Sequence, residues 1–191
     1  MRVIARKGMS AATIAEIADE AGVAKGTIYL YFRDRDELVE KTFETAIAQL
    51  HARVDTAMAT ARSFQEKLRA YVTAKFAFFQ ENREFFRLYS SLRMPEGSPQ
   101  QQRRQRRTCQ PQYRARIEAM AAEVKVAIGK GEVRKMDPMR LALFLVEGST
   151  AIVLERLTED TSPPMQDDVD LIVDLLMSGV APNKPKRSRT N

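Results

Sequence analysis

Residues 13–38, TIAEIADEAGVAKGTIYLYFRDRDEL, read as two short helices joined by a tight turn. Ile14, Ile17 and Ala18 recur at i, i+3 and i+4, so the first helix has one apolar face. Gly22 stands where this helix has to end in a left-handed residue, a conformation that glycine adopts without steric cost. Two helices joined by a short glycine turn, the second free to enter a groove, form the helix-turn-helix arrangement.

The second helix, expected from about residue 25 to residue 31, turns polar and aromatic side chains outward. Ile28 and Phe32 are its inward positions, and Lys25, Tyr29 and Tyr31 are left outside. An ordinary solvent-exposed face is one interpretation. Two aromatic side chains kept outward beside a Lys-Gly-Thr run favour contact with duplex DNA instead. The residues predicted to contact DNA are Thr13, Ala24, Lys25, Gly26, Thr27, Tyr29, Leu30, Tyr31 and Arg35.

Three of these residues have a distinct expected role. Gly26 allows the backbone to come close to the duplex. Thr13, at a helix start, offers its hydroxyl and amide to a phosphate, and Arg35 is a candidate phosphate clamp. Leu30 and its neighbours indicate apolar or single contacts with base edges rather than bidentate hydrogen bonds.

The segment closely resembles the DNA-binding domain of TetR-family transcriptional repressors. The turn glycine, the Lys-Gly-Thr run, the aromatic pair and the Asp-Glu-Leu that opens the next helix fall in register. The match covers about residues 10–50, roughly a fifth of the chain. Members usually have a capping serine where Ala24 stands, and alanine there costs roughly 0.5–2 kcal/mol. The family's first helix is nearly absent, with Val3 and Ile4 as its tail, so we expect that the chain begins late relative to the family.

Composition predicts an all-α fold. The chain has 191 residues and 44% hydrophobic content, glycine and proline are scarce, and alternating strand patterns are absent. We expect an N-terminal helix-turn-helix head at 1–45, a C-terminal helical ligand-binding and dimerisation domain at 46–181, and a basic mobile tail at 182–191.

Several function classes are excluded by the same inspection. No run of 18 apolar residues could span a membrane, and the N-terminus has no apolar segment of a secretion signal. The single cysteine, Cys109, fits a reducing cytoplasm. Because His51 and Cys109 lack companions, no metal site, cofactor or enzymatic nucleophile is expected.

The net charge of +6 does not by itself locate a DNA-binding surface. Residues 1–38 carry six Lys/Arg and six Asp/Glu, so their sum is zero. The excess lies in residues 98–116 and in the tail at 182–191. The arginine-rich run at 103–107 is read as a solvated segment, with contact to an anionic ligand such as an acyl-CoA phosphate as the alternative.

The rest of the chain reads as further helices. The first two are expected at 36–61 and at 63–82, the second of them opened by Ser63 with Glu66. A short helix at 84–92 follows, and then a helix that Pro111 begins or kinks and that stops at Gly129. The last two are expected from Asp137 and Pro138 to about 158, and at 165–178, where Gly179 closes the helix.

The last two of these helices are apolar on more than one face. Such a helix in a soluble protein is buried on both sides, either at the centre of the monomer or against a partner. The TetR resemblance implies the partner, since the last two helices of these repressors pair with their copies in a four-helix bundle. The predicted interface residues are Gly148, Ile152, Ile172, Leu175 and Leu176.

Eight aromatic residues lie between Phe64 and Tyr89. A packed core accounts for most of them. The adjacent pairs Phe78-Phe79 and Phe85-Phe86 cannot keep both members on one helical face, so some face a second environment, which the resemblance implies is a lipophilic ligand pocket. The predicted pocket residues are Tyr71, Phe76, Phe79, Phe85, Phe86, Tyr89, Met120, Phe144 and the acid Glu147.

The sequence thus predicts a homodimeric DNA-binding transcriptional regulator, a repressor of a palindromic operator that a small hydrophobic effector releases. A constitutive DNA-binding dimer without an effector and a helical small-molecule-binding protein are the alternatives.

Overall fold

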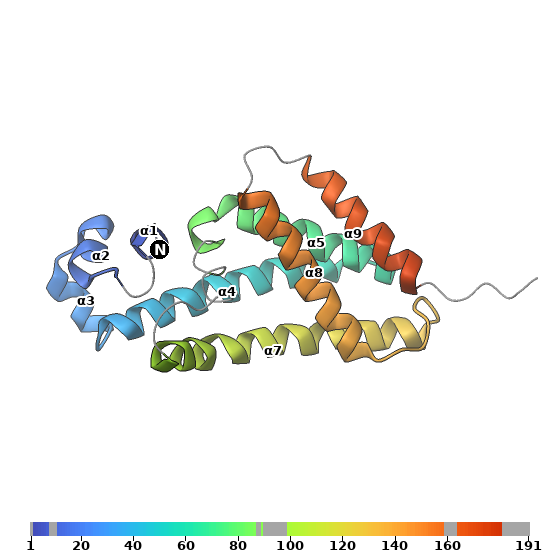
Figure 1. Cartoon of the computed structure of the whole chain (residues 1–191), viewed down its shortest axis with the longest axis horizontal. Helices are drawn as coiled ribbons and strands as arrows, with labels where there is room; N and C mark the ends of the chain where they lie inside the picture. Colours follow the sequence, from blue (N-terminus) through green and yellow to red (C-terminus); the bar gives the residue numbers. More distant parts are fainter. Residues whose placement is uncertain (1, 8–10, 87–88, 90–98, 159–163, 181–191) are drawn as a thin grey trace, which may run out of the picture. The chain divides into compact units, whose positions relative to one another are not determined.

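The computed structural model describes residues 2–7, 11–86, 89, 99–158 and 164–180, and within these ranges it is helical with no strand (Figure 1). The all-α prediction is confirmed. The helices are α1 (Arg2–Lys7), α2 (Ile14–Ala21), α3 (Lys25–Tyr31), α4 (Arg35–Ala59), α5 (Phe64–Glu81), α7 (Pro99–Gly129), α8 (Pro138–Thr158) and α9 (Met165–Val180). None of the described helices is long and apolar enough to cross a membrane.

Some sequence expectations fall outside these ranges. The basic tail at 182–191 lies outside the described residues, as does most of the helix expected at 84–92, of which 84–86 and 89 are described and helical. For residues 99–110 the backbone alone is described, so the side chains of the arginine-rich run at 103–107 and of Cys109 also lie outside.

The chain divides into two compact units. The first contains residues 1–53 and 75–115, and the second contains residues 54–74 and 116–191. The first unit holds α1, α2 and α3, the second holds α8 and α9, and α4, α5 and α7 contribute residues to both. The domain limits expected at residues 45 and 181 stay predictions.

Within the first unit, α2 and α3 pack beside the beginning of α4 (Figure 1). Their shared core consists of Ile14, Ala18, Ile28 and Leu38, all at most 7% exposed. Gly22 closes α2 at φ 67°, the left-handed conformation that the sequence requires there. The helix-turn-helix arrangement is therefore present with its turn glycine in the expected place.

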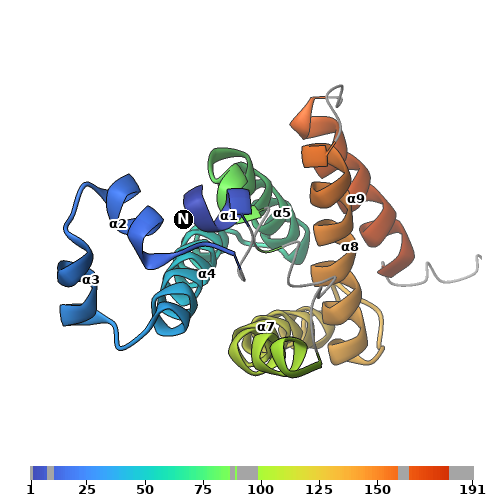
Figure 2. The same cartoon turned by 60° about the vertical axis from the view of Figure 1, so that its left-hand side comes forward.

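The boundaries of the later helices agree with the sequence prediction in part. Asp137 Oδ1 accepts hydrogen bonds from the amides of Met139 at 2.9 Å and Arg140 at 3.3 Å, which opens α8 as predicted. Pro111 lies inside α7, so it does not begin that helix. Gly179 does not end α9, which continues to Val180. Figures 1 and 2 both show α8 and α9 side by side.

Ser63 forms half of the capping box expected at the start of α5. Its Oγ accepts a 3.2 Å hydrogen bond from the Glu66 amide. The Glu66 carboxylate accepts instead from the Arg62 amide at 2.7 Å, one residue earlier than the box requires. The cap is thus shared between two residues, and α5 begins where the sequence predicts.

Candidate functional site

The outer face of α3 is apolar and aromatic. Leu30 is 80% exposed, Tyr31 77% and Tyr29 50%, while Ile28, which precedes them, is 7% exposed. Lys25 also lies at the surface. Large apolar side chains left in water on one short helix mark a contact surface. The side chains predicted to reach outward do so.

The N-terminus of α3 has no side-chain cap. Ala24 makes no capping hydrogen bond through its side chain, as its identity dictates, and the Thr27 amide donates to the Ala24 carbonyl at 2.9 Å. Inward packing of Ile28 and Phe32 against the shared core holds the helix in place. Tertiary contacts, rather than a cap, position this helix.

Gly26 stands on the exposed side of α3 without a steric need for glycine. A Cβ atom built there would meet nothing within 4 Å, and the residue is not among the glycines with positive φ. Glycine inside a helix costs up to about 1 kcal/mol relative to alanine. This open space faces solvent, so a DNA duplex could approach the helix backbone closely there.

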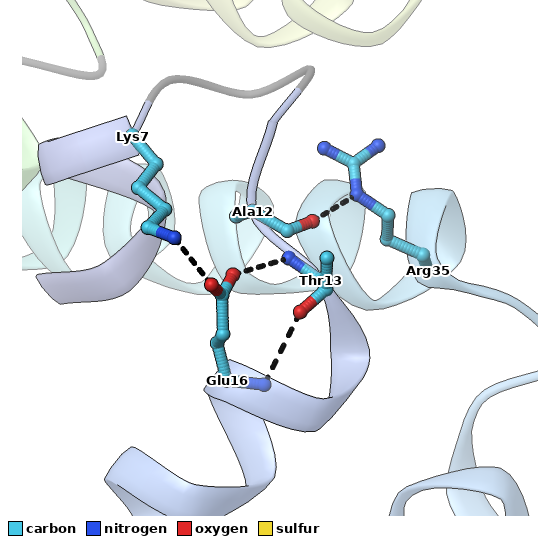
Figure 3. A network of polar contacts seen from close by, with 5 residues as sticks. All are labelled: Lys7, Ala12, Thr13, Glu16 and Arg35. Atoms are coloured by element: carbon cyan, nitrogen blue, oxygen red, sulfur yellow. Dashed lines mark hydrogen bonds and ion pairs between the residues drawn. The ribbon is translucent and has the colours of Figure 1, made fainter.

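A polar network ties the segment before α2 to its neighbours (Figure 3). Lys7 Nζ donates to Glu16 Oε1, and Glu16 Oε2 accepts from the Thr13 amide at 3.1 Å. The Glu16 amide donates in turn to Thr13 Oγ1 at 3.3 Å, which completes a capping box. The hydrogen bond from Lys7, followed by those from Thr13, lowers the pKa of Glu16 from 4.5 to about 2.

This network alters the expected roles of Thr13 and Arg35. The Thr13 amide is already bonded to Glu16, so its hydroxyl is the group left to donate to a phosphate. Arg35 Nε donates to the Ala12 carbonyl, and its Nη1 lies 2.9 Å from Asp36 Oδ1. In this conformation Arg35 fastens the segment before α2 to α4, and its remaining nitrogen, Nη2, is buried without a hydrogen-bond partner among the described residues.

The aromatic residues of the first unit form a packed cluster. The rings of Phe79 and Phe85 are stacked with centroids 5.9 Å apart, and Phe79 meets Phe86 and Tyr89 at 5.2 Å each. Phe76 is also buried, as are Tyr71 and Met120 in the second unit. These contacts have the geometry of a hydrophobic core. A ligand between the rings would have to separate them, so the pocket stays a prediction.

The two predicted pocket residues on α8 differ in exposure, and the role of Glu147 stays a prediction. Phe144 is 66% exposed, so it does not line an internal pocket, and Glu147 is half-buried rather than buried. The prediction for Phe144 was wrong because residues 141–146 are all apolar. Such a run fits any orientation of the helix equally well, and periodicity cannot choose between them.

The predicted interface residues divide between the outside and the inside of the second unit. Leu175 is 66% exposed, and Gly148, Ile152 and Leu176 are half-buried, whereas Ile172 is 4% exposed. Ile172 therefore belongs to the core of this unit, a correction with the same cause as that for Phe144.

The outward residues border a groove between α8 and α9. It has a volume of about 430 Å³, and its walls include Phe144, Leu175, Leu176 and Arg140. The two helices are held together by an ion pair in which Arg156 Nη1 lies 2.6 Å from Asp168 Oδ2. Exposed apolar side chains on both sides of a groove mark a surface that needs a partner.

Sequence reasoning missed two buried cations among the described residues, Lys75 of α5 and Arg116 of α7, and the contacts of Arg116 are the more informative. The Arg116 side chain is 8% exposed, its Nη1 lies 2.7 Å from Asp55 Oδ1, and its guanidinium carbon is 5.8 Å from the ring centroid of Tyr71. Its Nε is buried without a hydrogen-bond partner among the described residues. The signal was available, because Arg116 precedes Met120 by four residues and so extends the apolar stripe of α7 by one turn.

Known proteins resemble the head and the whole fold. Residues 1–42 match the family model described as bacterial regulatory proteins, tetR family. An uncharacterized HTH-type transcriptional regulator of Haemophilus influenzae is 33% identical over 98 residues, 51% of each chain. The chain thus spans about half the length of that curated relative.

Two solved structures resemble nearly the whole chain. A putative fatty acid metabolism regulator of Clostridium perfringens has a TM-score of 0.75, with 26% identity and 95% of both chains covered. The transcriptional regulator FadR of Bacillus subtilis, solved in complex with stearoyl-CoA, has a TM-score of 0.80 over 93% of both chains. At 20% identity, this second similarity shows the fold alone. The helix-turn-helix at residues 1–42 is thus assigned to the tetR family of bacterial regulatory proteins, and the remaining helices have the fold of these solved regulators.

Proposed function

We propose that this regulator is a homodimeric repressor, that α3 of each copy enters the major groove of a palindromic operator, and that a small apolar effector releases the DNA. The observation that carries the proposal is the outer face of α3, where Tyr29, Leu30 and Tyr31 are at least half exposed beside an open Gly26. A regulator of this kind acts where the chromosome lies, in the cytoplasm.

DNA binding is tested with a duplex selected from a random library by the purified protein. Affinity is then measured by fluorescence anisotropy at several salt concentrations. Tyr29→Ala is expected to weaken binding by about 1–3 kcal/mol. Lys25→Ala is expected to weaken binding to all sequences and to reduce the salt slope by about 1. Val126→Ala, a change at an exposed position of α7, is the matched control. Unchanged affinity in well-folded Tyr29→Ala and Lys25→Ala variants contradicts the assignment of α3.

The homodimer is supported by the outer surface of α8 and α9. Phe144 and Leu175 are both 66% exposed, and Gly148 on α8 has nothing within 4 Å of a Cβ position, so another helix could approach closely there. A permanent interface of this kind buries about 2,000 Å² or more. A two-fold dimer then sets the spacing of the two operator half-sites.

The effector proposal rests on the apolar helical core and on the similarity to regulators of fatty acid metabolism. The relative from Bacillus subtilis was solved with stearoyl-CoA, so long-chain acyl compounds are the first class to test. An effector must favour the released conformer by several kcal/mol to shift occupancy from mostly bound to mostly free.

A thermal-shift screen compares long-chain acyl-CoA and fatty acids with sugars as polar controls. At a concentration of 100 times its Kd, a ligand raises the stability of the folded state by about 2.7 kcal/mol. We expect the acyl compounds to raise the melting temperature and to release the selected duplex. Specific DNA binding without any stabilising compound would favour a constitutive dimer. Ligand binding without specific DNA binding would favour a helical small-molecule-binding protein.

A further inference from the structure

Leu30 lies at the centre of the outward face of α3. Successive residues of an α-helix are about 100° apart, so Leu30 points almost opposite to Ile28 and Phe32, which pack inward. At 80% exposure, Leu30 is the most exposed large apolar side chain in the described part of the chain. It is therefore the side chain of α3 that meets a surface approaching the helix from outside.

The residue one turn before Leu30 is Gly26. Helical side chains lean toward the N-terminus of their helix, so Leu30 leans toward the turn that holds Gly26. A Cβ atom at Gly26 would meet nothing within 4 Å beyond its neighbours in the chain and the backbone of its own helix, so the backbone there is open beside an apolar side chain. Tyr31, 77% exposed, flanks Leu30. Together they form a small apolar surface that another molecule can approach closely.

Few side chains of α3 can read a base edge through two hydrogen bonds. Its sequence, KGTIYLY, contains no Arg, Asn, Gln, Asp or Glu, so Lys25 is its one side chain of the bidentate kind, and the hydroxyl groups of Thr27, Tyr29 and Tyr31 offer single hydrogen bonds. The feature of the major groove that complements an apolar surface is the 5-methyl group of thymine. An apolar reading surface and a thymine methyl exclude water from each other when they meet.

We propose that Leu30 reads the 5-methyl group of a thymine in each operator half-site, and that Gly26 lets the helix approach closely enough for this contact. The inference rests on the proposed function, because it requires α3 to lie in the major groove. It assigns the sequence preference of this regulator to an apolar contact rather than to a bidentate hydrogen bond.

The test uses the full chain and a duplex that it selects from a random library. Each thymine of the selected half-site is replaced, in both half-sites, by 2′-deoxyuridine, which keeps the hydrogen-bonding edge and lacks the methyl group. We expect one thymine position at which each lost methyl weakens wild-type binding about fourfold, and both together about sixteenfold. Substitution at thymines outside this position has little effect.

Leu30→Ala isolates the side chain responsible. This variant should fold normally, because the side chain is largely in water. It is expected to bind the thymine duplex more weakly than wild type and to bind the thymine and deoxyuridine duplexes with nearly equal affinity. Val126→Ala, which alters an exposed side chain of α7, should retain the wild-type preference.

Three results would overturn the inference. Wild-type binding that is indifferent to deoxyuridine at every position shows that no methyl is read, and it leaves the proposed function standing. A Leu30→Ala variant that keeps the full preference shows that another side chain reads the methyl. Failure to select any duplex removes the proposed function and the inference with it.

Discussion

Arg116 Nη1 on α7 donates a 2.7 Å hydrogen bond to Asp55 Oδ1 on α4, although the Arg116 side chain is 8% exposed and that of Asp55 is 63% exposed. The pair joins a cation inside the second unit to a carboxylate at its surface. A buried charge is tolerated when its partner is present and is costly when it is not.

The two partners should therefore respond differently to substitution. Asp55→Ala leaves the buried guanidinium without its carboxylate and is expected to lower the free energy of unfolding by about 1–3 kcal/mol, less than for a fully buried pair because Asp55 is largely in water. Arg116→Met removes the charge and the unbonded Nε, and is expected to change stability by less than Asp55→Ala does. Urea denaturation measures both. A larger loss in Arg116→Met than in Asp55→Ala contradicts this account.

Gly26→Ala should separate stability from function. The added methyl meets nothing within 4 Å and improves helix propensity, so the head should become more stable by up to about 1 kcal/mol. Affinity for the selected duplex should fall, because the methyl group occupies the approach surface. Gly129→Ala is the matched control, because a Cβ there also meets nothing within 4 Å and the residue ends α7, away from the residues predicted to contact DNA, so this variant should leave DNA binding unchanged. Tighter binding by Gly26→Ala would show that no close approach occurs there.

Charge on the outer surface of α8 and α9 should break the homodimer. Phe144→Glu and Leu175→Glu are expected to give folded monomers in sedimentation experiments at micromolar concentration, because both side chains are 66% exposed within one chain. Val126→Glu, 51% exposed on α7, is the control and should leave the dimer intact. Ile172→Glu should instead prevent folding, since Ile172 is buried inside the unit. A wild-type monomer at this concentration would refute the dimer.

Stability should depend on Glu16 at acidic pH. The pKa of Glu16 is depressed to about 2, so its contribution to stability is complete above its usual pKa of 4.5 and is lost as the pH falls from there through about 2. We expect wild type to lose stability more steeply than Glu16→Gln across this range. Lys7→Met removes the hydrogen bond that lowers the pKa of Glu16 most. The pKa of Glu16, measured by NMR titration, should then move back toward 4.5. A Glu16 that titrates near 4.5 in wild type would contradict the network.

The sequence predicted the head in detail because its signals are local. Gly22 at a left-handed position, the inward Ile28 and the outward aromatic residues are each specified by a few neighbours in the chain. The capping of α8 by Asp137 was predictable for the same reason. Local chemistry of this kind does not depend on the rest of the fold.

Other features depend on which way a helix faces. Phe144 and Ile172 were misplaced because α8 and α9 have apolar residues around most of their circumference, which leaves the buried side undetermined. Arg35 and Arg116 are charged, and charged side chains are usually exposed. In the structure Arg35 is bonded to the Ala12 carbonyl, and Arg116 is buried beside Tyr71. A prediction from charge alone places such side chains in solvent, whereas the tertiary packing of the helices places these two against other residues.

The missing cap of α3 has a consequence for how DNA binding depends on temperature. This helix has seven residues, no side-chain cap and one buried side chain, Ile28. Segments with so few internal contacts open locally at a free-energy cost well below that of global unfolding. We therefore expect the amide hydrogens of α3 to exchange faster than those of α2, whose start is capped, and to slow strongly when the operator is bound. Part of the free energy of association is then spent on ordering the reading helix. Because that ordering is entropically unfavourable, warming should loosen the complex more than the contacts alone would predict.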